Sequence, residues 1–289
     1  MTKLALGTAQ FGLTYGNANP QPQIAYAEAK NIVDCAYSNG INVLDTAMAY
    51  GESEAHLGKI GINGWKVVSK LPEVPMGENV SAWITSAVRS SLDKLKIESL
   101  YGLLLHRPAQ LLGDRGLEIN AALQSLKYEG LVMKTGISIY KPSELEYLMT
   151  IGGVDLVQSP LSVLDRRLIT SGWLERLVDC GVEVHARSVF LQGVLLMSAA
   201  QRPKKFDRWL DLWDRYHDWV QETGLSPLEA CLAYVSSLPQ ISQVVVGVNG
   251  LNHIQQILQA QINQMPNCLP ELETEDEELL NPLAWLSLT

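Results

Sequence analysis

The segment Leu4-Ala5-Leu6-Gly7-Thr8-Ala9-Gln10-Phe11-Gly12 decides the fold class, because a short apolar run leads directly into a turn that contains glycine. In doubly wound sheets that bind dinucleotides, the turn after the first strand normally carries the pattern G-x-G-x-x-G. The glycines of this turn do not fit that pattern, and the chain also lacks a P-loop sequence. A closed parallel barrel is therefore favoured, and an open doubly wound sheet is the alternative.

Short apolar runs alternate with longer amphipathic stretches along most of the chain. The predicted strands are Leu4–Thr8, Asn42–Asp45, Lys66–Lys70, Tyr101–His106, Met133–Ser138, Val154–Gln158, Val182–Arg187 and Gln243–Gly247. Most are almost continuously hydrophobic, which is typical of parallel strands buried on both faces. Between them, stretches such as Val80–Leu95 carry apolar residues at spacings of three and four, as amphipathic helices do. Eight strand–helix units predict a single (β/α)8 TIM barrel domain.

The predicted barrel spans about residues 4–262 of the 289. Phe206–Glu222, rich in Trp and charged residues, is predicted to be an inserted helix or loop before the last strand–helix unit. Residues 263–289 are predicted to form a C-terminal loop. The Trp residues in these two segments are interpreted either as packing of the extra helix or as walls of a substrate cleft.

The composition restricts the class of protein. Hydrophobic residues make up 47% of the chain and charged residues 18%, which is enough apolar material for a large core. No stretch resembles a membrane span or a signal peptide, so a cytoplasmic location is expected. The net charge of −9 argues against nucleic acid or an anionic membrane as a partner. The four cysteines show neither C-x-x-C nor metal-ligand spacing, so no metal site is predicted.

Polar residues stand where several of the apolar runs end. Asp45, Lys70 and His106 end the second, third and fourth runs, and Tyr50 follows five residues after Asp45. Barrel enzymes place their catalytic groups at the carboxyl ends of the strands. We therefore expect these four side chains to meet at one mouth of the barrel.

This set of groups suits the reduction of a carbonyl compound. A Tyr hydroxyl can protonate the carbonyl oxygen, but the pKa of free Tyr is about 10. We expect the Lys70 ammonium to lower the pKa of Tyr50, Asp45 to orient Lys70, and a neutral His106 to position the carbonyl. Each residue alone also has an ordinary explanation: a helix cap for Asp45, packing for Tyr50 and His106, and a solvated lysine for Lys70.

Three segments together resemble the aldo-keto reductase superfamily. They are Leu44-Asp45-Thr46-Ala47-Met48-Ala49-Tyr50-Gly51-Glu52-Ser53-Glu54, Val67-Val68-Ser69-Lys70-Leu71 and Leu103-Leu104-Leu105-His106-Arg107-Pro108. The resemblance extends from about Leu4 to Ile262. It implies an NAD(P)-dependent oxidoreductase that interconverts an aldehyde or ketone and an alcohol, with Asp45, Tyr50, Lys70 and His106 as its catalytic residues.

The resemblance also implies a cofactor site, and it favours NADPH while leaving NADH possible. The implied cofactor-binding residues are Gly7, Thr8, Asp45, Ser138, Gln158, Arg187, Ser188, Leu191, Gly247, Asn249, His253 and Gln256. Of these, Ser138 and Gln158 would contact the carboxamide, and Gly247-Val248-Asn249 would form the phosphate loop.

The chain departs from its relatives at three places. Arg187 stands where many of them stack an aromatic residue on the nicotinamide. Asn249 stands where many carry a Lys or Arg that pairs with the 2′-phosphate of NADPH, which opens the choice of cofactor. Because the first predicted strand begins near Leu4, there is no room for the β-hairpin with which many relatives begin.

Two other functions are kept as hypotheses. Relatives such as potassium-channel β subunits suggest a nucleotide-binding regulatory subunit, and Lys70 on this fold suggests a Schiff-base aldolase. Arg107, Arg187, Trp213 and the tail are candidates for shaping a polar pocket, which together with similar sequences linked to sugar metabolism suggests a sugar-like carbonyl as substrate. The oligomeric state is left open.

Overall fold

Eight parallel strands close into a barrel in sequence order in this computed structural model, which describes residues 2–14, 16, 22–260 and 271–288. The strands are β1 (Leu4–Gly7), β2 (Val43–Asp45), β3 (Lys66–Leu71), β4 (Leu100–Leu105), β5 (Val132–Ser138), β6 (Leu156–Pro160), β7 (Glu183–Arg187) and β8 (Gln243–Gly247). The ring closes where β1 pairs with β8, with Gly7 opposite Gly247. The predicted (β/α)8 fold is confirmed, and each predicted strand agrees with an observed one to within two residues.

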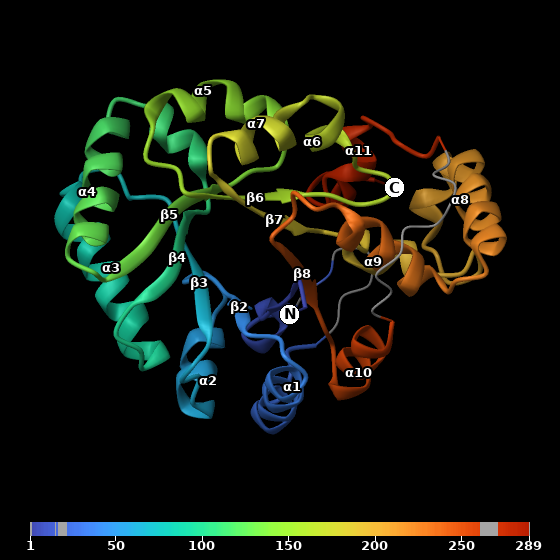
Figure 1. Ribbon diagram of the computed structural model, residues 1–289, viewed down its shortest axis with the longest axis horizontal. Helices are drawn as coiled ribbons and strands as arrows, with labels where there is room; N and C mark the ends of the chain where they lie inside the picture. Colours follow the sequence, from blue (N-terminus) through green and yellow to red (C-terminus); the bar gives the residue numbers. More distant parts are fainter. Residues whose placement is uncertain (1, 15, 17–21, 261–270, 289) are drawn as a thin grey trace.

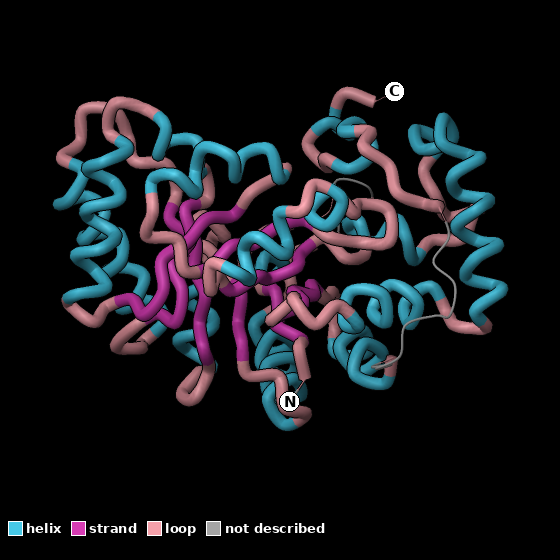
Figure 2. The backbone as a smooth tube through the Cα atoms, turned by 45° about the horizontal axis from the view of Figure 1, so that its top comes forward, coloured by secondary structure: helices cyan, strands magenta, loops and turns pink. Residues whose placement is uncertain are grey.

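Helices surround the barrel in the order in which they occur in the chain (Figure 1). They are α1 (Tyr26–Ser38), α2 (Ser53–Ile60), α3 (Val80–Leu95), α4 (Gly116–Tyr128), α5 (Leu145–Ile151), α6 (Arg167–Thr170), α7 (Trp173–Asp179), α9 (Pro227–Ser237) and α10 (Leu251–Gln259). Single 3-10 turns, η1 (Ala9–Phe11), η2 (Pro108–Leu112) and η3 (Pro142–Glu144), lie in the loops. Figure 2 shows the strands enclosed by this layer of helices.

The core has two parts because strand side chains alternate between two faces. One face of each strand packs against the helices in a large apolar cluster. The other face points into the barrel, where a small separate cluster forms the middle layer: Ala5, Val43, Val68, Leu104 and Leu156. Two residues further along the same five strands come Gly7, Asp45, Lys70, His106 and Gln158. The period of two therefore places the polar residues in one layer at the carboxyl end of the barrel, directly above an apolar layer.

An ionic cluster lies at the opposite end of the barrel. Glu183 of β7 accepts hydrogen bonds from the Tyr101 hydroxyl at 2.7 Å, from Lys134 Nζ and from His185 Nε2 at 2.7 Å. Burial alone would raise the pKa of Glu183, but the hydrogen bonds from His185, Lys134 and Tyr101 lower it to about 2. Hydrogen-bonded polar side chains thus fill the interior at this end of the barrel, which is opposite the end that carries the polar layer.

The Trp-rich insertion is a helix and not a loop. After the turns η4 (Leu191–Leu196) and η5 (Lys204–Trp209), helix α8 (Leu210–Thr223) lies outside the ring of barrel helices. Trp213, Tyr216 and Trp219 are buried, and Trp213 Nε1 donates to Phe206 O at 2.8 Å. These contacts support the packing interpretation for Trp213, and its full burial removes it from the candidates for a substrate pocket.

The described part of the tail also folds onto the insertion. It contains α11 (Glu277–Leu280) and the turn η6 (Ala284–Leu286) within the segment that was predicted to be a loop. Trp285 is fully buried against the ring of Phe206, with 5.0 Å between the ring centroids. Trp285 therefore packs the tail in place, and its burial excludes direct contact with substrate. Residues 261–270, where the barrel was predicted to end, lie outside the described residues.

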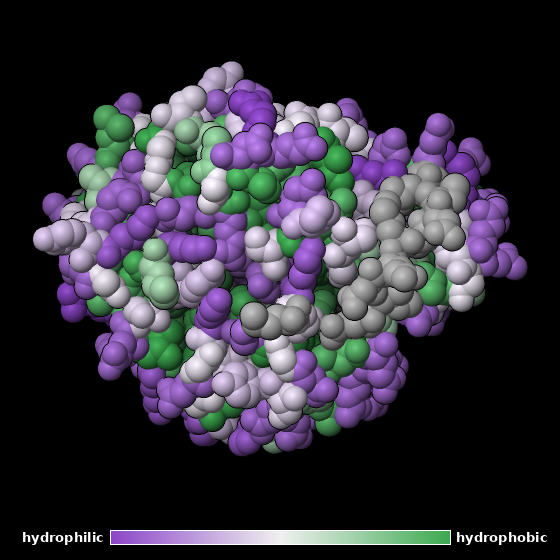
Figure 3. Space-filling model, in the orientation of Figure 1, coloured by the Kyte–Doolittle hydropathy of each residue, from purple (hydrophilic) through white to green (hydrophobic). Residues whose placement is uncertain are grey.

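No helix in the described ranges is long and apolar enough to cross a membrane. The same residues contain no group of three His, Cys, Asp or Glu side chains that could hold a metal ion. The face of the molecule shown in Figure 3 is largely hydrophilic, with small hydrophobic patches between polar side chains.

Candidate active site

A buried ion pair lies at the centre of the polar layer. Lys70 Nζ of β3 donates to Asp45 Oδ2 of β2 at 2.7 Å and to the Thr46 carbonyl at 2.9 Å. Lys70 is 2% exposed and Asp45 is 5% exposed. Because both charges are removed from water, each depends on the other for its stability. The pair therefore fixes the direction of the ammonium.

Asp45 is held from a second side by the residues predicted to contact a carboxamide. Gln158 Nε2 of β6 donates to Asp45 Oδ1 at 2.6 Å, and Ser138 Oγ of β5 donates to Gln158 Oε1 at 3.4 Å. Both side chains are buried. A chain of hydrogen bonds thus connects Lys70 on β3 to Ser138 on β5 across the interior of the barrel.

Tyr50 and His106 complete the predicted group of four. The two rings meet edge to face with 6.0 Å between their centroids, and Lys70 Nζ lies 5.2 Å from the centroid of the Tyr50 ring. Tyr50 comes from the loop after β2, and His106 follows the last residue of β4. All four residues predicted to be catalytic therefore meet at the carboxyl end of the barrel.

The pKa of Tyr50 is raised, whereas the sequence analysis expected Lys70 to lower it. Burial disfavours the phenolate, and the negative charge of Asp45 raises the pKa further, while Arg187 acts in the lowering direction. The expectation is wrong because the ammonium faces Asp45 at 2.7 Å, so that the pair presents little net charge to the phenol. At neutral pH, Tyr50 therefore carries its proton.

His106 is neutral at physiological pH. Burial lowers its pKa to about 4, and the nearby charge of Lys70 contributes in the same direction. A neutral imidazole has one N–H group to donate and one nitrogen to accept. His106 can thus hydrogen-bond a carbonyl oxygen without adding a charge to the site, as the sequence analysis expected.

The lowered pKa of His106 predicts a loss of stability in mild acid. Between pH 6.5 and about 4 the unfolded chain binds a proton at this position and the folded chain does not, so the stability falls as the pH decreases. In a His106→Gln variant, the free energy of unfolding should fall by roughly 2 kcal/mol less between pH 7.5 and pH 4.5, after allowance for partial exposure. Urea unfolding at the two pH values measures this difference. Equal losses in the two proteins would contradict it.

Arg187 ends β7 in the same layer. Its Nη2 donates to Ile139 O at 2.8 Å, its Nη1 donates to Ser188 Oγ at 3.1 Å, and its guanidinium lies over the Tyr140 ring at 4.8 Å from the centroid. Its charge lowers the pKa of both Tyr50 and His106. Arg187 therefore brings a positive charge close to the catalytic group while its plane rests on an aromatic ring.

The turn after Arg187 has a strained backbone. Ser188, Leu191 and Gln192 have positive φ angles of 59°, 47° and 49°, and Gly193 follows at 90°. Residues other than glycine rarely adopt this conformation, and such strain persists mainly at functional sites and ligand clamps. Ser188 and Leu191, both predicted to bind the cofactor, thus lie in this strained turn.

Gly7 and Thr8 lie at the end of β1 with different surroundings. Gly7 pairs with Gly247, and both lack a side chain where the barrel opens. Thr8 is fully buried, and its hydroxyl donates to Asp45 O at 3.0 Å. Thr8 therefore secures the backbone of Asp45, and its burial limits direct contact with a ligand.

The remaining predicted residues stand apart from this layer. Asn249, His253 and Gln256 are exposed at the beginning of α10. The Asn249 N–H donates to His253 Nδ1 at 3.3 Å. The Leu251 N–H donates to Glu28 Oε1 at 2.7 Å. The structure therefore groups these residues around the N-terminus of α10 and not around Tyr50.

Several contributors were missed by the sequence analysis. Gly12 lies so close to the Tyr50 loop that an added Cβ atom would lie 1.7 Å from Tyr50 O. Glu54, 2% exposed, accepts hydrogen bonds from Ser69 Oγ and Ser91 Oγ, both at 2.7 Å. Glu54 ends the Leu44–Glu54 segment that carries the family resemblance, and its place there was a signal of its importance. Nothing in the spacing of Gly12 indicated its contact with the Tyr50 loop.

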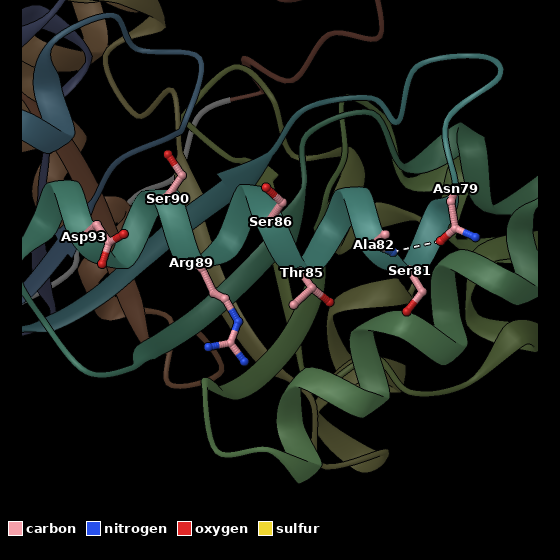
Figure 4. Close-up of a pocket in the computed structure, with 8 residues that line it drawn as sticks. All are labelled: Asn79, Ser81, Ala82, Thr85, Ser86, Arg89, Ser90 and Asp93. Carbon is pink, nitrogen blue, oxygen red and sulfur yellow. Dashed lines mark hydrogen bonds between the residues drawn. The ribbon is translucent and has the colours of Figure 1, made fainter.

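A hollow on the outside of the barrel is unrelated to this site. It runs along α3 between Asn79 and Asp93 and is lined mostly by short polar side chains of that helix (Figure 4). Asn79 Oδ1 accepts from the Ala82 N–H at 2.9 Å as a helix cap, and Arg89 reaches Glu129, which follows α4. These two contacts are ordinary helix chemistry.

The eight-stranded parallel barrel with a buried Asp–Lys pair, a Tyr and a His at its carboxyl mouth is an arrangement that suits an oxidoreductase acting on carbonyl compounds. The chain belongs to the aldo/keto reductase family, whose model matches residues 3–267.

Individual proteins resemble the chain over most of its length. It is 26% identical over 254 residues to the uncharacterized oxidoreductase YqkF of Bacillus subtilis (strain 168), covering 81% of this chain and 82% of that protein. It is 23% identical to a probable voltage-gated potassium channel subunit beta of Arabidopsis thaliana, covering 96% and 94%. The solved holo form of the aldo-keto reductase AKR11C1 from Bacillus halodurans covers 91% of this chain and 88% of its own, with a TM-score of 0.74 and 22% identity.

Proposed function

We propose that the protein is an NAD(P)H-dependent reductase that converts an aldehyde or ketone to an alcohol, reversibly, with Tyr50 as the proton donor. The observation that carries this proposal is the meeting of Asp45, Tyr50, Lys70 and His106 at one end of the barrel. The family and the fold support carbonyl reduction in general, and the roles of these residues are what we add.

The residues around this group fit a nicotinamide dinucleotide. Ser138 and Gln158 offer hydroxyl and amide groups, which suit a carboxamide, in the layer of the Asp45–Lys70 pair. The strained turn at 188–193 suits a pyrophosphate. When bound, the nicotinamide supplies the hydride. Ser138, Gln158, Arg187 and the turn would hold it.

The side chains then divide the remaining work. Neutral His106 donates a hydrogen bond to the carbonyl oxygen and orients it. Tyr50, whose raised pKa keeps it protonated, gives its proton to that oxygen as negative charge develops there. Arg187, whose charge acts to lower the pKa of Tyr50, stabilises the phenolate that is left, and the Asp45–Lys70 pair holds its fixed place beside the ring.

The Schiff-base alternative is disfavoured by the same ion pair. An amine must lose its proton to attack a carbonyl carbon. Lys70 Nζ donates to Asp45 Oδ2 and to the Thr46 carbonyl, so both acceptors direct the nitrogen away from a role as nucleophile. The regulatory-subunit alternative retains support from the similarity to a channel β subunit, which extends over 96% of this chain.

For the substrate, we propose a small polar carbonyl compound of the kind found in sugars. Arg187 and Arg107 bring positive charge to the surroundings of His106, where both lower its pKa. A hydroxylated aldehyde could accept hydrogen bonds there. The oligomeric state stays open, and a cytoplasmic location without nucleic-acid or membrane partners stays a proposal.

Fluorescence-quenching titration with NADH and NADPH, followed by a panel of carbonyl compounds, tests the proposal. We expect at least one dinucleotide to bind with a micromolar Kd and the complex to reduce at least one hydroxylated aldehyde. Binding without turnover on the whole panel, together with a stable partner that co-purifies, would favour the regulatory subunit. Failure of both dinucleotides to bind would overturn the proposed function.

A further inference from the structure

The N-terminus of α10 is already occupied by a carboxylate from another helix. Glu28 of α1 accepts the Leu251 N–H through Oε1 at 2.7 Å, although the two residues are 223 positions apart. Helices α1 and α10 pack side by side, as Figure 1 shows. A Cβ atom added at Gly250 would lie 3.3 Å from the same Glu28 oxygen. The carboxylate is thus fitted against the turn and the first N–H groups of α10.

The groups around this carboxylate give little compensation for a second anion. The segment from Gly247 to Gln259 contains no Lys or Arg. The exposed Asn249 N–H is directed to His253 Nδ1 at 3.3 Å. Of the lysines near α1, Lys30 pairs with Asp34, and Lys59 lies over the Tyr26 ring at 4.3 Å from its centroid. Among the described residues, an anion placed at this turn would therefore face Glu28 with no Lys or Arg of α10 beside it.

We infer that Glu28 makes the protein prefer NADH to NADPH. The inference rests on the proposed function, together with the phosphate loop that the family resemblance implies at Gly247–Asn249. The 2′-hydroxyl of NADH can donate a hydrogen bond to a carboxylate. The 2′-phosphate of NADPH would bring like charge to it, which is unfavourable. The preference for NADH therefore comes from repulsion between Glu28 and the 2′-phosphate of NADPH, together with a hydrogen bond from the 2′-hydroxyl of NADH to Glu28.

Direct binding measurements on the whole protein test the role of Glu28 without using turnover. Fluorescence-quenching titrations give the Kd values of NADH and NADPH for the wild type and for Glu28→Gln. Gln keeps an oxygen that can accept the Leu251 N–H but removes the charge. Glu118→Gln, at an exposed position in the first turn of α4, is the matched control for the loss of one negative charge, because Glu28 holds the same position in α1.

The wild type should bind NADH at least about tenfold more tightly than NADPH, which corresponds to about 1.4 kcal/mol. Glu28→Gln should reduce this ratio by at least about tenfold, mainly through tighter binding of NADPH, while Glu118→Gln should leave it unchanged. In the wild type alone, raising the ionic strength should narrow the ratio, because salt screens the repulsion. This last measurement does not depend on how well any variant folds.

Four results would overturn the inference: a wild type that binds NADPH as tightly as NADH, a ratio that does not change in folded Glu28→Gln, a ratio that salt does not narrow, or an equal change of the ratio in Glu118→Gln. The last result would assign the effect to general charge. If neither dinucleotide binds the wild type, the proposed function itself has failed, so the two failures are distinguishable.

Discussion

The Tyr50→Phe variant should reduce carbonyl compounds about 10²- to 10⁴-fold more slowly in kcat, because it removes the general acid and leaves the ring in place. The phenol is protonated at neutral pH, since burial and the charge of Asp45 raise its pKa. The hydroxyl therefore has a proton to give when charge develops on the carbonyl oxygen. Single-turnover kinetics with saturating dinucleotide measure this step directly.

Binding should survive in the same variant. The predicted carboxamide residues Ser138 and Gln158 reach Asp45 and do not depend on the Tyr50 hydroxyl. The Kd for the dinucleotide should therefore change by less than about threefold, which is less than 1 kcal/mol. Tyr128→Phe, at a highly exposed position on α4, is the control for the loss of a hydroxyl. If Tyr50→Phe retained wild-type turnover with a good substrate, Tyr50 would not be the proton donor.

Lys70→Met should produce the largest loss of stability among changes in the site. It leaves Asp45 as a buried carboxylate, 5% exposed, with only Gln158 donating to its side chain. Removal of one partner of a buried ion pair typically costs about 3–5 kcal/mol. For a chain of this size we expect a decrease in Tm on the order of 10 °C. Differential scanning calorimetry at pH 7 measures it.

A double-mutant cycle separates the ion pair from the packing. Asp45→Asn alone should also destabilise the protein, because the Lys70 ammonium would then be buried without a counter-charge. The double variant Asp45→Asn/Lys70→Met removes both charges and should be more stable than the sum of the two single losses by about 2 kcal/mol or more. Additive losses would mean that the two charges do not depend on each other, contrary to the 2.7 Å contact.

The fold and the grouping of polar residues at the barrel mouth were predictable because both follow from local periodicity. An interior residue recurs every second position along a strand, so Val43 and Asp45, or Val68 and Lys70, share a face. The carboxyl ends of parallel strands meet at one edge. Knowing only where the apolar runs end, one can therefore place Asp45, Lys70 and His106 together.

Two properties of the site were beyond local periodicity. The direction of the Tyr50 pKa shift depends on how deeply the ring is buried and on whether Lys70 is already neutralised by Asp45. Likewise, Glu28 looks like an ordinary first-turn acid of α1, because nothing in its neighbourhood in the chain indicates Leu251. Both properties depend on contacts between groups that are distant in the sequence and that only the folded chain brings together.

The sequence by itself determined the eight-unit barrel, the residues at its carboxyl mouth and the chemistry that those residues can perform, because side-chain direction in a strand depends on nearest neighbours. Only the tertiary structure decided that the pKa of Tyr50 is raised and not lowered, and that Glu28 covers the beginning of α10. Both outcomes come from through-space electrostatics and burial, and distance in space between charged groups is independent of their separation along the chain.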